Sequence, residues 1–159
     1  MKTARTWAAL LCMAVSSGPA AARAAVSPHA ENAAAAVTTI CAPFVLQRSG
    51  PVNDKLMSFG PKAPVRIKFT QSEKTGNRNC AVETDGSAEA VAAMLSAVRA
   101  LPSLVWTDSP ESEARLTLYC GKLGDRTFLA QFSRSDAGTV LFVLNELTPL
   151  GASRVCSAK

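Results

Sequence analysis

The spacing of apolar residues predicts helices at the start of the chain. Ser27-Pro28 matches a helix N-cap followed by proline at the first helical position. Because proline cannot donate a backbone hydrogen bond inside a helix, Pro43 predicts that this helix kinks there or ends near Thr39. Gly50-Pro51 then introduces a second predicted helix over Val52–Phe59. The apolar face of the first helix comprises Val37, Ile40, Cys41, Phe44 and Val45.

A β-hairpin and a central amphipathic helix follow. Apolar and polar residues alternate over 65–70, which indicates a half-buried strand with its charged face in water. Gly76-Asn77 predicts a turn, and 79–84 a returning strand. Asp85-Gly86-Ser87 caps a predicted helix over 88–101. The apolar stripe of that helix is Val91, Met94, Leu95, Val98 and Leu101.

The last third of the chain has the pattern of an antiparallel meander. A brief strand is predicted at 104–106, and apolar residues alternate along 114–120 and 128–132. The continuous apolar run within 139–147 predicts a central strand covered on both faces. No segment is long enough for the crossovers of a parallel sheet. We therefore predict an α+β fold, with N-terminal helices, a hairpin, a central helix and a C-terminal meander, and with the helices packed on one face of an antiparallel sheet.

Residues 1–24 have the pattern of a cleavable signal peptide. Lys2 and Arg5 precede an uncharged, mostly apolar run at 7–15, which is too short to span a bilayer as a helix. Small residues follow, and Ala22-Arg23-Ala24 fits the cleavage pattern. We expect residues 25–159 to form one small domain without a transmembrane segment, in the periplasm or secreted.

Removal of this leader changes the charge. The chain has 17 basic and 12 acidic residues, a net charge of +5. Three of the basic residues and none of the acidic ones lie in the leader, so the mature chain would carry only +2. The basic isoelectric point therefore does not indicate a nucleic-acid partner.

Four cysteines remain in the mature chain, and their even number in an oxidising compartment favours two disulfides over metal binding. No C-x-x-C pair is present, which argues against zinc or thiol-redox chemistry. In an up-down-up meander, the strand ending at Cys120 and the strand ending near Leu147 finish at the same edge. The tail can then return Cys156 to Cys120, which leaves Cys41 for Cys80.

No catalytic, metal or cofactor motif is found. His29 is the only histidine, and so near the predicted mature N-terminus we expect it to be an exposed terminal residue rather than a base. Two pairs of acids stand two residues apart, as carboxylate chemistry could use, although surface acids often do so by chance. These pairs are Glu83 with Asp85 and Glu111 with Glu113.

Charge is segregated along the chain. Residues 62–78 contain five basic residues and one acid, and residues 79–114 six acids and one basic residue. The first hairpin is therefore predicted to present a basic face to an anionic partner, with no aromatic residues for base stacking. The alternative is that charged side chains keep an edge strand from pairing with other chains. The candidate binding residues are Arg66, Lys68, Lys74 and Arg78.

The segments Ile40-Cys41-Ala42-Pro43-Phe44-Val45 and Asn79-Cys80-Ala81-Val82 resemble a group of small, uncharacterised secreted proteins and lipoproteins of proteobacteria. The resemblance covers about a third of the mature chain and implies export and the first two cysteines. No activity comes with it.

These patterns favour an exported, non-catalytic binding or accessory protein, whose partner would be an envelope protein or an anionic envelope polymer. The alternative is a carboxylate-dependent hydrolase of the cell envelope that uses acids near Asp85 or Glu111.

The leader yields a first prediction. Exported protein should begin at Ala25, or at Arg23 if the Ala20-Ala21-Ala22 register is used, because small residues flank both positions. Intact-mass measurement of periplasmic protein checks this. A stable product that retains Met1 to Ala20 would contradict export by signal cleavage.

Overall fold

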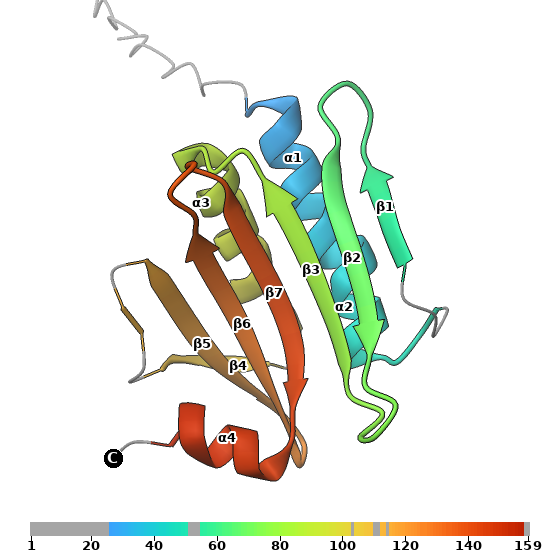
Figure 1. The fold of residues 1–159 in the computed structure, drawn as a ribbon, viewed down its shortest axis with the longest axis vertical. Coiled ribbons are helices and arrows are strands. Elements are labelled where there is room, and N and C mark those ends of the chain that lie inside the picture. Colours follow the sequence, from blue (N-terminus) through green and yellow to red (C-terminus); the bar gives the residue numbers. More distant parts are fainter. Residues whose placement is uncertain (1–25, 51–54, 103, 110–111, 114, 158–159) are drawn as a thin grey trace, which may run out of the picture.

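The computed structural model describes residues 26–50, 55–102, 104–109, 112–113 and 115–157. In these residues, seven strands form one antiparallel sheet in the order β1-β2-β3-β7-β6-β5-β4, and α1 and α3 lie behind it (Figure 1). The strands are β1 (Lys55–Phe59), β2 (Val65–Gln71), β3 (Arg78–Thr84), β4 (Val105–Asp108), β5 (Leu116–Leu123), β6 (Arg126–Arg134) and β7 (Val140–Leu147). The helices are α1 (Pro28–Ala35), the π-helical η1 (Ala36–Cys41), α2 (Ala42–Leu46), α3 (Ala88–Arg99) and α4 (Pro149–Val155). The predicted α+β class is confirmed. The predicted signal peptide lies outside the described residues.

The first helix is capped as predicted but passes through Pro43 without ending. The side chain of Ser27 accepts a hydrogen bond from the N–H of Ala30. The turn before Pro43 is a π-helix, in which the N–H of Ala42 donates to the carbonyl of Val37. This wider turn changes the hydrogen-bond register just where proline has no N–H to offer, so the helix continues to Leu46.

The second predicted helix, Val52–Phe59, is wrong. Residues 55–59 form β1, which pairs with β2 along its whole length, and residues 52–54 lie outside the described residues. Met57 and Phe59 point to the helix side, so this short segment gains more from pairing and burial than from a helical turn. Because β1 covers β2, the charged face of β2 does not protect a sheet edge.

Small residues bring the first helix and α3 close together. Ala30, Ala33 and Ala36 have no exposed surface, and α1 packs against α3. On α3, Ala90 and Ala97 join Met94 and Val98 in the core. The predicted stripe is therefore rotated, with Val91 and Leu95 only partly buried at its margin.

The strand β7 is central, as predicted, but only one of its faces is fully covered. Phe142 and Leu144 are completely buried beneath the helices, while Leu141 on the other face is 40% exposed. The C-terminal helix α4 lies on that other face, at the corner over β5 and β6 (Figure 1). It covers a second, smaller apolar cluster, Leu118, Cys120 and Leu129.

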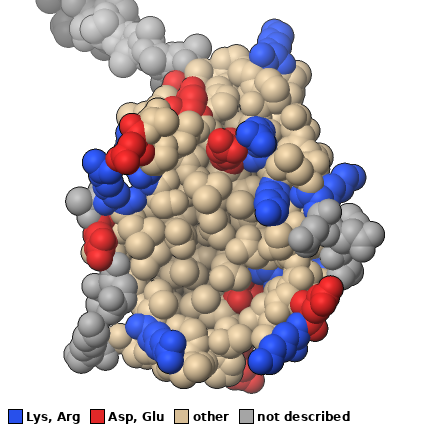
Figure 2. Space-filling model, in the orientation of Figure 1, with Lys and Arg blue, Asp and Glu red and all other residues tan. Residues whose placement is uncertain are grey.

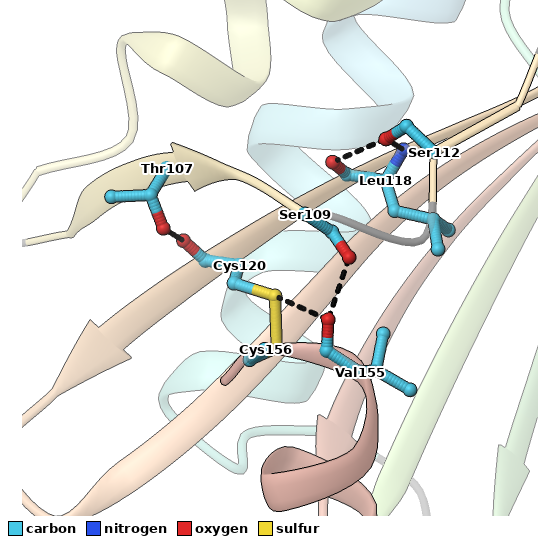
Figure 3. The surroundings of a disulfide bond; sticks show 7 residues. All are labelled: Thr107, Ser109, Ser112, Leu118, Cys120, Val155 and Cys156. Atoms are coloured by element: carbon cyan, nitrogen blue, oxygen red, sulfur yellow. Dashed lines mark hydrogen bonds between the residues drawn. A yellow bond between two sulfur atoms is a disulfide. The ribbon is translucent and has the colours of Figure 1, made fainter. Parts of the chain in front are cut away.

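Both predicted disulfides, Cys41–Cys80 and Cys120–Cys156, are confirmed. The first joins the π-helical segment to β3 inside the main core, where both cysteines have no exposed surface. The second fastens the end of α4 to β5 (Figure 3). Beside it, the hydroxyl of Ser109 donates to the carbonyl of Val155 at 2.6 Å, which adds a polar contact to the same end of α4.

Two arginines from the sheet hold the C-terminal end of α2. Arg78 donates to the carbonyls of Phe44 and Ser49 at 3.2 and 3.1 Å. Arg126 donates to the carbonyls of Val45 and Leu46 at 3.0 and 2.8 Å. These carbonyls lie at the end of the helix, where the helix itself supplies no donors, so the guanidinium groups act as a long-range cap.

Glu146 of β7 completes this arrangement. Only 6% of the residue is exposed. Its carboxylate accepts hydrogen bonds from Arg126 at 2.7 Å and from Arg48 at 2.9 and 3.0 Å. Burial alone would raise the pKa of Glu146, but the hydrogen bonds and positive charges of the two arginines outweigh it and hold the pKa below its ordinary value. The carboxylate is therefore a structural counter-ion.

A second prediction compares the two disulfides. Sequence separations of 39 and 36 residues give nearly equal loop entropies, so each Cys→Ala pair should cost about 4 kcal/mol of unfolding free energy. Cys41→Ala/Cys80→Ala should cost about 1 kcal/mol more than Cys120→Ala/Cys156→Ala, because it also leaves a core cavity. Urea unfolding under non-reducing conditions measures both, and a larger loss at Cys120–Cys156 would contradict the ranking.

A third prediction concerns Glu146. Glu146→Gln should lower the free energy of unfolding at pH 7 by about 2 kcal/mol, because two guanidinium groups lose their counter-ion. A depressed carboxyl pKa stabilises the fold above the pKa of the unfolded chain, and this stability is lost as the pH falls through the folded-state pKa. The difference from wild type should therefore shrink on acidification.

Urea titrations of Glu146→Gln at pH 7 and at pH 3 measure that difference. Glu83→Gln is the matched control, because it removes an exposed carboxylate and should cost less than about 0.5 kcal/mol. An equal loss at both pH values would show that the charge of Glu146 is not what stabilises the fold.

Candidate binding surface

Among the described residues, only α4 covers the face of the sheet opposite α1 and α3, and it does so at one corner. We call the uncovered part of this face, over β2, β3, β7 and β6, the open face. Figure 2 looks onto it: the middle is largely free of charged side chains, which gather mainly toward the margins. The register of the paired strands places the residues of the open face in rows that cross the sheet. One row crosses the sheet as Lys68, Ala81, Val143 and Gln131, and the next as Thr70, Asn79 and Asn145.

The carboxamides in these rows are open to a ligand. Asn79 and Asn145 are directly opposite on β3 and β7, and Gln131 lies on β6, each side chain partly exposed. No hydrogen bond joins these three side chains to another residue of the described ranges. Each carboxamide has both a donor and an acceptor, so together they suit a ligand that alternates the two.

Two hollows lie on the open face beside these rows. Thr70, Asn79, Asn145 and Thr148 help to line one of about 520 Å³ at the α4 end. At the other side, a hollow of about 380 Å³ lies between Leu56, Lys68 and Leu141, beside the Arg66–Glu83 pair. The open face is thus hollowed at two places and offers polar, apolar and charged contacts within a short distance.

The predicted basic residues are divided between the two faces. Arg66 is exposed on the open face, and its guanidinium lies 3.5 Å from the carboxylate of Glu83. Lys68 lies on the same face, and Lys74 is exposed in the β2–β3 turn. Within the described residues, neither lysine is paired with a carboxylate. The prediction was wrong for Arg78.

Arg78 is 7% exposed and belongs to the helix side, where it caps α2. It shares the strand parity of Cys80 and Val82, so alternation along β3 already indicated the covered face. Its guanidinium group binds carbonyls inside the protein, so Arg78 is not part of the candidate binding surface. Lys68, with the partly neutralised Arg66, remains as the positive margin of the open face.

His29 is not the exposed terminal residue that we expected. Its side chain is 19% exposed, and its Nε2 accepts a hydrogen bond from the N–H of Asp85 at 3.2 Å. The carboxylate of Asp85 accepts from the N–H of Ser87 at 3.0 Å. Hydrogen bonding to Ser87 holds the pKa of Asp85 below its ordinary value. The contacts join the start of α1 to the turn before α3.

The two acids of the first predicted carboxylate pair, Glu83 and Asp85, are engaged in other contacts. Glu83 faces Arg66, whereas Asp85 is taken up by the turn, and its lowered pKa is the opposite of what a general acid requires. Glu113 is exposed beside β5, and Glu111 lies outside the described residues. The described residues also contain no group of three or more His, Cys, Asp or Glu placed to hold a metal ion.

Comparisons with protein-family models, curated proteins and solved structures find no match for this chain. The resemblance to small secreted proteobacterial proteins therefore stays a prediction. Among the described helices, none has the length and apolar character needed to cross a membrane.

Proposed function

We propose that this protein is an exported, non-catalytic binding module of the cell envelope, in the periplasm or secreted, and that the open face docks an anionic partner. The observation that carries the proposal is the open face itself, where carboxamides and Lys68 have no side-chain partner within the part of the chain that the structure describes. An ordinary solvated sheet face is dominated by charged or mutually bonded side chains. A largely uncharged centre with a hollow on either side instead suits contact with another molecule.

Both disulfides support the proposed compartment, because such bonds persist in oxidising surroundings. The predicted leader agrees with them. The cytosol keeps thiols reduced, and Cys41–Cys80 is part of the main core, so we expect the folded protein to depend on an oxidising environment.

The margin of the open face indicates the chemistry of the partner. Within the described residues, Lys68 and Lys74 form no ion pair, and the exposed contact of Arg66 with Glu83 leaves Arg66 able to bind a carboxylate of the partner as well. An acidic segment of an envelope protein fits this margin and can use the carboxamides for its peptide groups. Nucleic acid fits poorly, because the described aromatic residues of β2, β5, β6 and β7 all lie among the buried residues.

A fourth prediction tests this surface. Arg66→Glu/Lys68→Glu should reduce capture of acidic envelope proteins about tenfold at low salt, and the difference should shrink at high salt as exposed charges are screened. Pull-down of tagged mature protein from envelope extract, with quantitative mass spectrometry, measures it. Lys55→Glu/Lys62→Glu is the control, with the same charge change outside the open face.

The fold of each variant is checked by circular dichroism and thermal unfolding, since all four positions are exposed. Asn79→Ala/Asn145→Ala provides a second arm and should weaken capture at both salt concentrations, because it removes hydrogen bonds rather than charge. Identical partner recovery from wild type and all the folded open-face variants would exclude this face as the binding site.

A further inference from the structure

A separate cleft lies on the helix side of the sheet, away from the open face. It runs between the second half of the first helix and the β1–β2 ribbon, where Figure 1 shows α2 behind β2. Its volume is about 290 Å³, at the lower end of the range for small-molecule sites. The described residues that line it are Thr39, Ile40, Pro43, Phe44, Ser49, Gly50, Lys55, Met57 and Phe69.

The floor of this cleft is held in place by the core. The rings of Phe44 and Phe69 meet edge to face, with their centroids 5.0 Å apart. The guanidinium carbon of Arg78 lies 4.8 Å from the centroid of the Phe44 ring, and Arg78 also donates to the Phe44 carbonyl. These contacts leave the two rings little freedom to collapse into the space, so the cleft exists before any ligand binds.

The walls are apolar and the mouth carries one positive charge. Ile40, Pro43 and Met57 line the sides. The hydroxyl of Thr39 already donates to the carbonyl of Ala35 at 2.7 Å, so it offers little to a ligand. Lys55 is exposed at the mouth, and among the described residues no carboxylate lies within ion-pair distance of it.

From this arrangement we infer a second binding site, for a single medium-length acyl chain that ends in a carboxylate. The hydrocarbon lies against Phe44 and Phe69, between Ile40 and Met57, and the carboxylate reaches the ammonium group of Lys55. An apolar interior with one unpaired cation complements this amphiphile better than a neutral or cationic one. The site does not depend on the function proposed for the open face.

Calorimetric titration of the intact mature protein with decanoate tests the site. We expect saturable binding of one decanoate per chain. Decanol, which has the same chain without the charge, should bind about two- to fivefold more weakly, the factor expected of one exposed ion pair. Lys55→Glu should weaken decanoate binding by at least that factor and leave decanol binding nearly unchanged.

Two neighbouring threonines give a matched pair of blocking variants. Thr38 and Thr39 are both exposed, and the hydroxyl of each donates to a carbonyl of the preceding turn, but only Thr39 lines the cleft. Thr39→Trp should fill the mouth and reduce decanoate affinity at least tenfold, whereas Thr38→Trp should leave it within about twofold of wild type. Thermal unfolding confirms that both variants are folded.

The result that overturns the proposal is an absence of saturable decanoate binding to wild type, or equal binding by Thr39→Trp. Binding to phosphatidylglycerol vesicles without binding of free decanoate would also overturn it, because it would assign the patch to a membrane surface. Lys68→Glu separates the two sites. It should leave decanoate binding unchanged, so a failure of partner capture and a failure of this cleft are distinguishable.

Discussion

The carbonyl groups at the end of α2 have no hydrogen-bond donors within their own helix, and the sheet supplies the donors that fix this helix in place. Arg78 from β3 and Arg126 from β6 each donate to two of the carbonyls between Phe44 and Ser49. Glu146 of β7 neutralises Arg126 from the same side. Three strands distant in sequence are thus tied to one helix end, which places the first helix across the middle of the sheet.

Because the first helix is fixed in this way, the main helices all cover the same face of the sheet. The first helix lies with α3 on a single face of the sheet, joined to β3 by Cys41–Cys80, and the alanines between the two helices let them cover that face closely. Of the described elements, only α4 lies on the other face, where the Cys120–Cys156 disulfide holds it at one corner. The open face is the consequence of this uneven cover, because no other described element covers Asn79, Asn145 and Leu141.

Opposite sides of the sheet thereby acquire different binding chemistry. The open face is broad, polar in its rows and positive at Lys68, which suits a macromolecular segment. The cleft under β1 is narrow and apolar, with Lys55 at its mouth, which suits one small amphiphile. The same arginine that caps α2 also packs on Phe44, so the anchor of the helix shapes the floor of the cleft. The two sites can therefore be tested separately.

The elements whose signals are local could be predicted from the order of the amino acids alone. Alternation placed β2 and β3, the Ser27 and Ser87 caps started their helices, and the meander was enough to pair the cysteines correctly. These succeed because side-chain periodicity and capping depend only on residues a few positions apart. The alternation along β3 also indicated that Arg78 is buried, although its positive charge led us to assign it to the basic face.

Features that depend on residues distant in the sequence became visible only in the folded chain. Residues 55–59 became a strand because β2 offered an edge, and Pro43 was accommodated because the helix had a sheet to remain packed against. The row of Asn79 and Asn145 exists because β3 pairs with β7, which brings together two residues 66 positions apart in the sequence. Only one face of β7 is fully covered, because α4 is fastened at a corner of the other face. Strand pairing and burial depend on residues from the whole chain, so a pattern of neighbouring residues cannot predict them.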